Sequence, residues 1–328
     1  MIPRLPEDPQ TRREFLRRLF RTTVGSAAAL SLGAWLYDPS LPPIAGADHE
    51  LVRLPDFSLG GAARMSVVRG GDRAGAARAA VKALGGMEAF VQPGERVVLK
   101  VNAAFASPPM VGATTHPDMV AAVARMCAEA GAAEVIVTDN PINDPGSCFA
   151  LTGIEEAAKN AGARVVPPRA DLFAPTSLDK GNLIVDWPLL HGPLAGADRL
   201  IGLAPVKNHH RSGASMSMKN WYGLLGGVRN VFHQDIHGII AELALLVRPT
   251  LVILDGTMSM MDNGPTGGSL ADLKPTNTVV ASTDHVAADA FACRLLDMSP
   301  GDLPHIAMAE QMGAGAADIP DVREVRLT

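Results

Sequence analysis

Cysteine is scarce in this chain of 328 residues, with three in all, at positions 127, 148 and 293. Their spacing fits no zinc site, and an iron–sulfur cluster needs four thiolates. Cys127 and Cys293 stand in alanine-rich stretches typical of helices, where a small buried thiol is the expected role. A disulfide is the less favoured alternative, and it would require an oxidising compartment. The sequence therefore predicts no iron–sulfur cluster and leaves any other cofactor unknown.

Aromatic residues make up only 4% of the chain, and several common motifs are missing. There is no G-x-S-x-G, P-loop or G-x-G-x-x-G motif, so the usual signatures of hydrolases, nucleoside triphosphatases and dinucleotide-binding proteins are lacking. The first 47 residues hold six arginines and four acids, so the formal net charge of −5 becomes −7 without them. Such an acidic domain has no general affinity for nucleic acid, and no basic helix suggests binding to a membrane surface.

Residues 1–47 are typical of an export signal and linker. The segment 11–17, Thr-Arg-Arg-Glu-Phe-Leu-Arg, matches the twin-arginine pattern, and a short, weakly apolar stretch follows it from Thr22 to Trp35. Ala45-Gly46-Ala47 offers a cleavage site; if it is not cut, the signal would tether the protein to the membrane. We therefore expect a periplasmic or exported protein whose partners include the twin-arginine translocase.

The remaining residues, 48–328, predict an α/β domain. Apolar runs expected to be strands (65–68, 96–101, 135–137, 164–166, 183–185, 200–203, 251–254 and 278–281) alternate with expected helices (72–84, 116–130, 154–161, 235–247, 287–296 and 303–312). This alternation favours a mostly parallel sheet with helices on both faces. The length allows either one domain or two lobes around a cleft, with a lobe boundary near the proline-rich segment 167–180.

The stretch from Ala204 to Gly227 concentrates basic and hydrogen-bonding residues. It contains Lys207, His209, Lys219 and Asn220 but no acid. We expect a strand that opens into a cationic loop and then a helix, and the loop would suit a small anionic ligand. On this view both lysines converge on one anion, so replacing either would weaken binding without destabilising the empty protein. The alternative is an ordinary basic surface loop.

Polar residues also end four of the expected strands: Asn102, Asp139, His209 and Asp255. Ligands of open α/β sheets bind beyond the carboxyl ends of the strands, so these endings predict a shared cleft. Lys100, near the end of an apolar strand, is costly to bury unpaired. It is expected to meet the ligand, or else to form a structural ion pair with Asp139 or Asp255.

Two glycine-containing turns are expected near the same cleft. Thr114, Thr115 and His116 lead into a helix whose free N–H groups could bind an anion, although capping of the helix by one of the threonines explains the same residues. Asn263 and Gly264 belong to a glycine-rich turn that follows Asp255. Further along the chain, Asp284 is expected to cap a helix and Asp289 to face inward.

Taken in order, several short motifs resemble the domain-of-unknown-function 362 family: Lys100-Val-Asn102, Thr114-Thr-His-Pro117, Pro205-Val-Lys-Asn-His209, Ser217-Met-Lys-Asn220, Asp255-Gly256, Asn263-Gly-Pro265 and Asp284-His-Val-Ala-Ala-Asp289. The resemblance spans about residues 65 to 300 and implies an α/β fold without a settled reaction. Some members of that family carry a ferredoxin-like cysteine cluster, and this chain departs from them there.

Three functions are compatible with these residues. The first is an enzyme in which Lys207 and Lys219 bind the anion, His209 is the general acid or base, and Asp255 orients or ligates. The second is a binding protein without turnover. The third is a metalloprotein with a redox role, using His116, His209, His233, His237 and Asp255; His233 and His237 are spaced to share one face of a helix, where the core or cleft wall is the favoured alternative. The expected ligand-binding residues are Lys100, Asn102, Thr114, Thr115, His116, Asn220, Asn263, Gly264 and Asp289.

Overall fold

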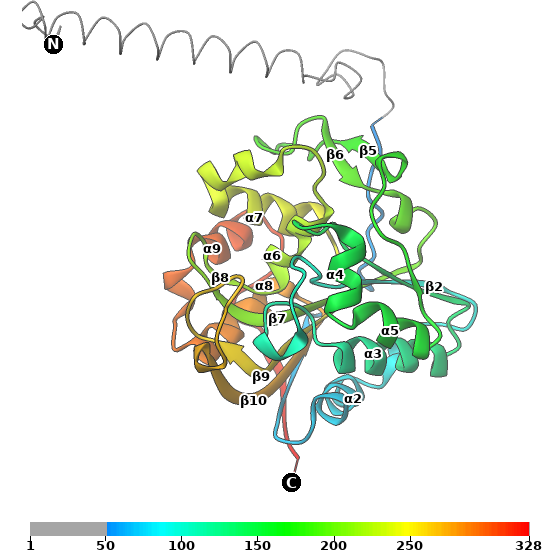
Figure 1. Ribbon diagram of the computed structural model, residues 1–328, viewed down its shortest axis with the longest axis vertical. Coiled ribbons are helices and arrows are strands. Elements are labelled where there is room, and N and C mark those ends of the chain that lie inside the picture. Colours follow the sequence, from blue (N-terminus) through cyan, green and yellow to red (C-terminus); the bar gives the residue numbers. More distant parts are fainter. Residues whose placement is uncertain (1–50, 328) are drawn as a thin grey trace, which may run out of the picture. The chain divides into compact units, whose positions relative to one another are not determined.

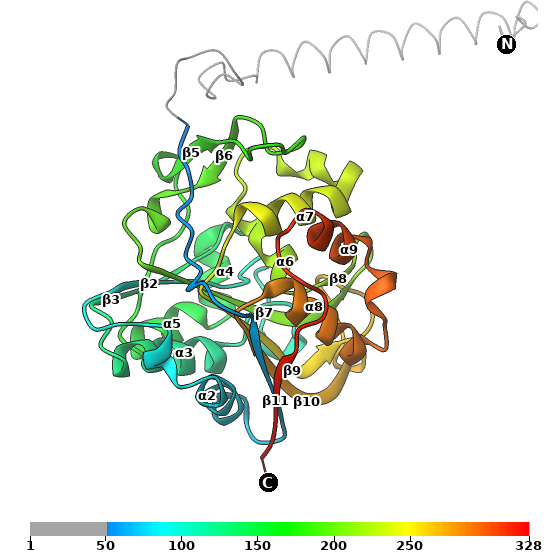
Figure 2. The same cartoon turned by 180° about the vertical axis from the view of Figure 1, so that it is seen from behind.

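A computed structural model describes residues 51–327, and the proposed export signal lies outside this range. Its main feature is a nine-stranded sheet with the strand order β11-β1-β10-β9-β7-β2-β3-β4, to which β8 adds by pairing with β7 (Figures 1 and 2). The strands are β1 (Arg64–Arg69), β2 (Arg96–Lys100), β3 (Glu134–Thr138), β4 (Arg164–Val165), β7 (Arg199–His209), β8 (Gly213–Ser215), β9 (Leu251–Met260), β10 (Leu273–Ser282) and β11 (Asp321–Arg326).

Most of the neighbouring strands run parallel. The pairs β4–β3, β3–β2, β2–β7, β7–β9 and β1–β11 are parallel, whereas β10 is antiparallel to both of its neighbours. The chain thus has the expected α/β fold with a mostly parallel sheet.

The helices lie on both faces of this sheet. They are α2 (Arg73–Ala83), α3 (Pro117–Glu129), α4 (Pro145–Leu151), α5 (Ile154–Asn160), α6 (Ser217–Asn220), α7 (Ile236–Leu246), α8 (His285–Ala292) and α9 (Pro304–Gln311). One core packs α2, α3 and α5 against the sheet, and a second core on the other face contains α6 to α9, as the two views show. No helix among residues 51–327 has the length and apolar character needed to cross a bilayer.

Alternation along the strands decides which face each residue serves. On β9, Val252 and Leu254 belong to the α6–α9 core, while Leu251 and Ile253 belong to the α2–α3 core. Asp255, next in the second series, therefore points to the α2 side of the sheet.

The local signals explain several element boundaries. Asp72 caps α2 by accepting from the N–H of Gly75, and Asp284 caps α8 by accepting from the N–H groups of Val286 and Ala287. The cap of α3 is the His116 side chain, which accepts from the N–H of Asp118. Capping by Thr114 or Thr115 is therefore wrong.

Some elements differ from the expectation. Residues 183–185 form no strand. Instead, β5 (Phe173–Thr176), which lies within the segment 167–180 expected as a lobe boundary, pairs with β6 (Trp187–Leu190) in a separate two-stranded sheet. β7 continues through His209 and turns back into β8, so the expected cationic loop is a hairpin followed by α6. This extension is polar because it runs past the buried sheet and borders a cavity.

Candidate functional site

A cavity of about 720 Å³ lies at the carboxyl ends of β2, β3 and β7. Its walls come from the residues after β2 and β3, the β7–β8 hairpin, α6, and two 3-10 helices, η5 (Trp221–Leu224) and η6 (Arg229–Asp235). The turn from Asn263 to Ser269 covers another side. Of the residues predicted for the site, those that line this cavity are Asn102, Lys207, His209, Lys219, Asn220, Asn263 and Gly264.

A buried ion pair underlies the cavity. Lys100 Nζ lies 2.7 Å from Asp139 Oδ1, and the two side chains are 0% and 2% exposed. Burial lowers the pKa of Lys100, and the Asp139 carboxylate opposes that shift. Asp139 Oδ2 accepts a hydrogen bond from the N–H of Ala103 at 2.6 Å. Of the alternatives for Lys100, the structure therefore shows the ion pair with Asp139.

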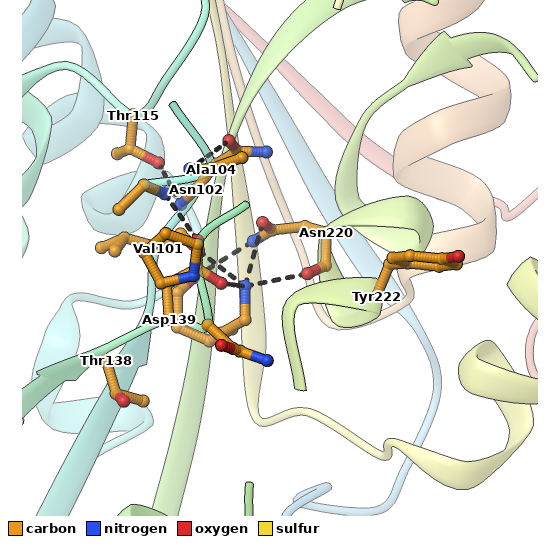
Figure 3. Close-up of polar contacts among 12 residues, drawn as sticks. Val101, Asn102, Ala104, Thr115, Thr138, Asp139, Asn220 and Tyr222 are labelled. Atoms are coloured by element: carbon orange, nitrogen blue, oxygen red, sulfur yellow. Dashed lines mark hydrogen bonds and ion pairs between the residues drawn. The ribbon is translucent and has the colours of Figure 1, made fainter. Parts of the chain in front are cut away.

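Asn220 and Gly223, in the wall of the cavity, pack directly against this ion pair. Lys100 Nζ donates to the backbone oxygen of Asn220 at 2.8 Å, and Asn220 Nδ2 donates to the backbone oxygens of Lys100 and Leu203 at 3.2 Å (Figure 3). A Cβ on Gly223 would overlap the Asp139 carboxylate, so only glycine allows this approach of the backbone. Asn220 thus serves mainly as a structural connector, because its amide is occupied by the protein.

Lys207 enters the cavity from the extension of β7. It is 1% exposed, and its Nζ donates to the backbone oxygens of Ala113 and Pro265, the latter at 3.2 Å. Burial and the nearby Lys219 ammonium lower the pKa of Lys207 to about 7. Replacing Lys207 would leave two backbone carbonyl groups without their donor. We therefore expect the replacement to lower the stability of the protein without ligand, contrary to the expectation from the sequence.

Lys219 has a different environment. Its Nζ lies 5.1 Å from the centroid of the Tyr222 ring, and Arg229 Cζ lies 5.8 Å from the same centroid. Arg229 is held by backbone oxygens of Tyr222, Leu225, Asn140 and Pro141. Burial and then the Arg229 charge lower the pKa of Lys219 to about 8. Lys219 is therefore a cation in a partly buried, positively charged wall.

The imidazole of His209 is neutral near pH 7. Burial, followed by the charges of Lys219 and Lys207, lowers its pKa to about 2. Its Nδ1 accepts from the backbone N–H groups of Arg211 and Ser212 at 3.2 and 3.3 Å, so Nε2 carries the proton. His209 is thus suited to donate a hydrogen bond to an anion, and it is a poor match for a proton carrier that titrates near pH 7.

Sequence reasoning missed three residues of this wall: Tyr222, Arg229 and His210. Arg229 gives no periodic signal because it is the first residue of a 3-10 helix that follows an irregular segment and leads directly into α7. Tyr222 lies in the acid-free stretch, and its hydroxyl donates to the backbone oxygen of Arg229 at 2.5 Å. A tyrosine three residues after a lysine in that stretch is a signal that could have identified Tyr222.

Asp255 belongs to a second, smaller cavity of about 200 Å³ on the α2 side of the sheet. It pairs with Arg73, with Nε and Oδ2 at 2.5 Å, and it accepts from the N–H and hydroxyl of Thr257. Thr114 and His116 line the same cavity. The expectation that Asp255 shares one cleft with His209 is wrong: both lie at the same edge of the sheet, but they line separate cavities.

Two further predicted residues are buried outside both cavities. Thr115 donates to the backbone oxygen of Leu203 at 2.9 Å and accepts from the N–H of Asn102 at 2.8 Å. Asp289 faces inward as expected, 1% exposed, and accepts from the N–H groups of Ser217 and Met218 and from the Ser217 hydroxyl. Burial raises the pKa of Asp289 to about 7. Both residues position elements of the site without lining it.

The five residues considered for a metal are dispersed. His209 and His233 line the larger cavity, His116 and Asp255 line the smaller one, and His237 contacts His305 through their Nδ1 atoms at 3.0 Å. His233 belongs to η6 and His237 to α7, so the two do not share one face of a continuous helix. Among residues 51–327, no three His, Cys, Asp or Glu side chains are placed to hold one ion. The three cysteines are free and buried.

The sequence profile of the family described as "Domain of unknown function (DUF362)" matches residues 97–294, which include every lining residue of the larger cavity. The chain belongs to this family. The DUF362 match spans both faces of the sheet, from β2 to η8 (Cys293–Leu296).

Relatives extend the comparison. The thylakoid-associated protein sll1697 of Synechocystis sp. is 29% identical over 244 residues, 72% of this chain and 74% of that protein. The lactate racemase apoprotein of Thermoanaerobacterium thermosaccharolyticum aligns with a TM-score of 0.39 and 11% identity, covering 73% of this chain and 58% of the racemase chain. A protein from Thermotoga maritima gives 0.34 and 10%, covering 73% and 59%. The two structural likenesses are too distant to carry a functional conclusion.

Proposed function

We propose that this DUF362 protein binds a small anionic ligand in the larger cavity. The observation that carries the proposal is the state of two lysines in its wall. Lys207 and Lys219 have lowered pKa values, and within residues 51–327 neither ammonium is paired with a carboxylate. A partly desolvated cation without a counter-ion gains most from an anion that supplies charge-assisted hydrogen bonds.

The charges around the cavity support the same conclusion. Of its two acidic side chains, Asp139 is neutralised by Lys100, and Asp272 accepts from Asn263 Nδ2 and the N–H of Ser269. The cations are Lys207, Lys219 and Arg229, so positive charge is in excess. A volume of about 720 Å³ is in the usual range for small-molecule sites. A mono- or dianion of a few carbon atoms is the chemical class that fits.

A catalytic form of this proposal uses a lysine as the acid or base. The pKa values of Lys207 and Lys219, about 7 and about 8, lie near the pH at which proton transfer is most effective, whereas that of His209 does not. Asp255 has no part in this version, because it lines the smaller cavity and is paired with Arg73. A binding protein without turnover uses the same residues for affinity alone.

The test is a binding screen with sulfate, phosphate, and small mono- and dicarboxylates, read by thermal unfolding and equilibrium dialysis. Lys219→Met should lower the affinity for the best anion roughly tenfold or more, as expected when a charged hydrogen bond is lost. Lys274→Met is the matched control, because Lys274 is an exposed lysine paired with Asp297. If no anion raises the melting temperature of the parent, or if both variants bind equally well, the proposal is wrong.

We also propose that the protein reaches its compartment through the twin-arginine pathway. The support is the sequence of residues 11–17, which lies outside the described part of the chain. Arg12→Lys with Arg13→Lys keeps the charge but removes both guanidinium groups. The double variant should accumulate as cytoplasmic precursor in a fractionation experiment; normal export of that variant would exclude the pathway.

A further inference from the structure

The three lysines around the larger cavity differ in what their amino groups contact. Lys100 Nζ is bound to Asp139 and to Asn220. Lys207 Nζ is bound to two backbone oxygens. Lys219 Nζ faces the Tyr222 ring, and in the described part of the chain it donates no hydrogen bond to any acceptor. Lys219 is therefore the amine whose lone pair could be used without dismantling a structural contact.

We propose that Lys219 Nζ attacks the carbonyl carbon of a small oxo acid held in this cavity and forms a reversible imine. The inference rests on the proposed function, since the carboxylate of the oxo acid would be the bound anion. The amine lone pair forms the C–N bond while the C=O π electrons move to oxygen, which takes up a proton as nitrogen loses one. Loss of that oxygen as water, with the second N–H proton, gives the C=N bond. Water is the only co-product.

The cavity favours the neutral amine that this step requires. Burial and Arg229 lower the pKa of Lys219 to about 8. At pH 7.5 about a quarter of such amines are unprotonated, against about one in a thousand for a lysine with the ordinary pKa. Arg229 cannot swing away to relieve the charge, because four backbone oxygens hold its guanidinium group. Desolvation beside a fixed cation is a known way to activate a lysine nucleophile.

Other groups in the wall could hold the carboxylate beside Lys219. Asn102 and His209 both line the cavity. Asn102 Nδ2 donates no hydrogen bond within residues 51–327, and His209 Nε2 carries the proton left by the two N–H groups on its Nδ1. These neutral donors would bind the carboxylate of an oxo acid without requiring Lys219 to be protonated. The site is thus better suited to an oxo acid than to a plain cation or an apolar ligand.

Reductive trapping tests the imine directly. The full chain is incubated at pH 7.5 with pyruvate, glyoxylate or 2-oxoglutarate and sodium cyanoborohydride, and the modified lysines are located by peptide mass spectrometry. At least one oxo acid should label Lys219 roughly tenfold faster than the exposed Lys82 and Lys180, because only Lys219 is desolvated beside Arg229. Lys219→Arg should abolish the site-specific adduct, and Lys274→Arg should leave it unchanged.

Propionate separates this inference from the proposed function, because it has the carboxylate but no keto group. If propionate and pyruvate both stabilise the protein through Lys219 while no oxo acid labels it faster than the surface lysines, the imine is excluded and anion binding stands. If no anion binds and nothing is trapped, both proposals fail. An adduct that persists in Lys219→Arg would place the chemistry at another amine and overturn the assignment.

Discussion

The two cavities at the carboxyl edge of the sheet show how the same kind of polar strand ending can lead to different outcomes. On the α2 side, the Arg73 guanidinium meets the Asp255 carboxylate at 2.5 Å, so the charges cancel inside the protein. In the larger cavity, the charge of Lys100 is cancelled by Asp139, but Lys219 remains without a carboxylate in the described residues. The position of the acids relative to the cations, more than the number of cations, thus distinguishes a structural ion pair from a candidate site. Four predictions test this distinction.

The largest effect is expected from Lys100→Met. It leaves Asp139 buried and uncompensated, which should cost about 3–5 kcal/mol in the free energy of unfolding. Urea unfolding measures this loss. The double variant Lys100→Met, Asp139→Asn should recover a large part of it, because the orphaned charge is removed; no recovery would mean that the pair matters through its hydrogen bonds alone.

A smaller loss in the free energy of unfolding is expected at the Arg73–Asp255 pair of the smaller cavity. Arg73→Met should cost about 1–3 kcal/mol, because Asp255 loses its cation but keeps the hydrogen bonds from Thr257. Anion affinity, measured by equilibrium dialysis, should stay within a factor of about two. A strong fall in affinity would show that the two cavities act together and that their separation is irrelevant to function.

The two lysines of the larger cavity should respond differently to the same substitution. Lys207→Met should lower the free energy of unfolding by about 1–2 kcal/mol, because two backbone oxygens lose a charged donor. Lys219→Met should leave it unchanged or slightly higher, because an uncompensated charge is removed. Denaturant melts without ligand measure both. Equal destabilisation would mean that Lys219 has a structural partner.

The smallest effect is a dependence on pH. The folded pKa of Lys219, about 8, lies below the value of about 10.4 for an ordinary lysine. Between these values the unfolded chain binds more protons than the folded one, so stability should rise with pH. Below about pH 8 both states are protonated, and the contribution is constant. The difference between parent and Lys219→Met in melts from pH 6.5 to 10 isolates this slope, and anion affinity should fall through pH 8. A flat difference would contradict the lowered pKa.

The fold could be predicted from the sequence because its strands are short apolar runs separated by helices with clear caps. Asp72 and Asp284 are examples of boundaries that the local chemistry dictates. β11 (Asp321–Arg326) was missed because it is an edge strand of charged and exposed residues without an apolar run. The far half of β7 was missed for a related reason, since Lys207 and His209 are polar side chains that border a cavity.

The candidate site was only partly predictable. The acid-free stretch correctly identified Lys207, His209 and Lys219 as residues that line one cavity. Their roles in binding a ligand stay predictions. The partner of Lys100 and the location of Asp255 depend on which face each strand residue points to and on how neighbouring strands are ordered. Those facts are properties of the assembled sheet, so the sequence left two acids open for Lys100 and placed Asp255 in the same cleft as His209.

Asp289 shows how a residue outside the larger cavity can position a residue that lines it. Its carboxylate fixes the first turn of α6 by accepting from Ser217 and Met218, directly before Lys219. A screen for loss of binding would therefore report Asp289 as strongly as a true contact residue. A redesign of this cavity should therefore keep Asp289 of α8, because it positions the helix that carries Lys219.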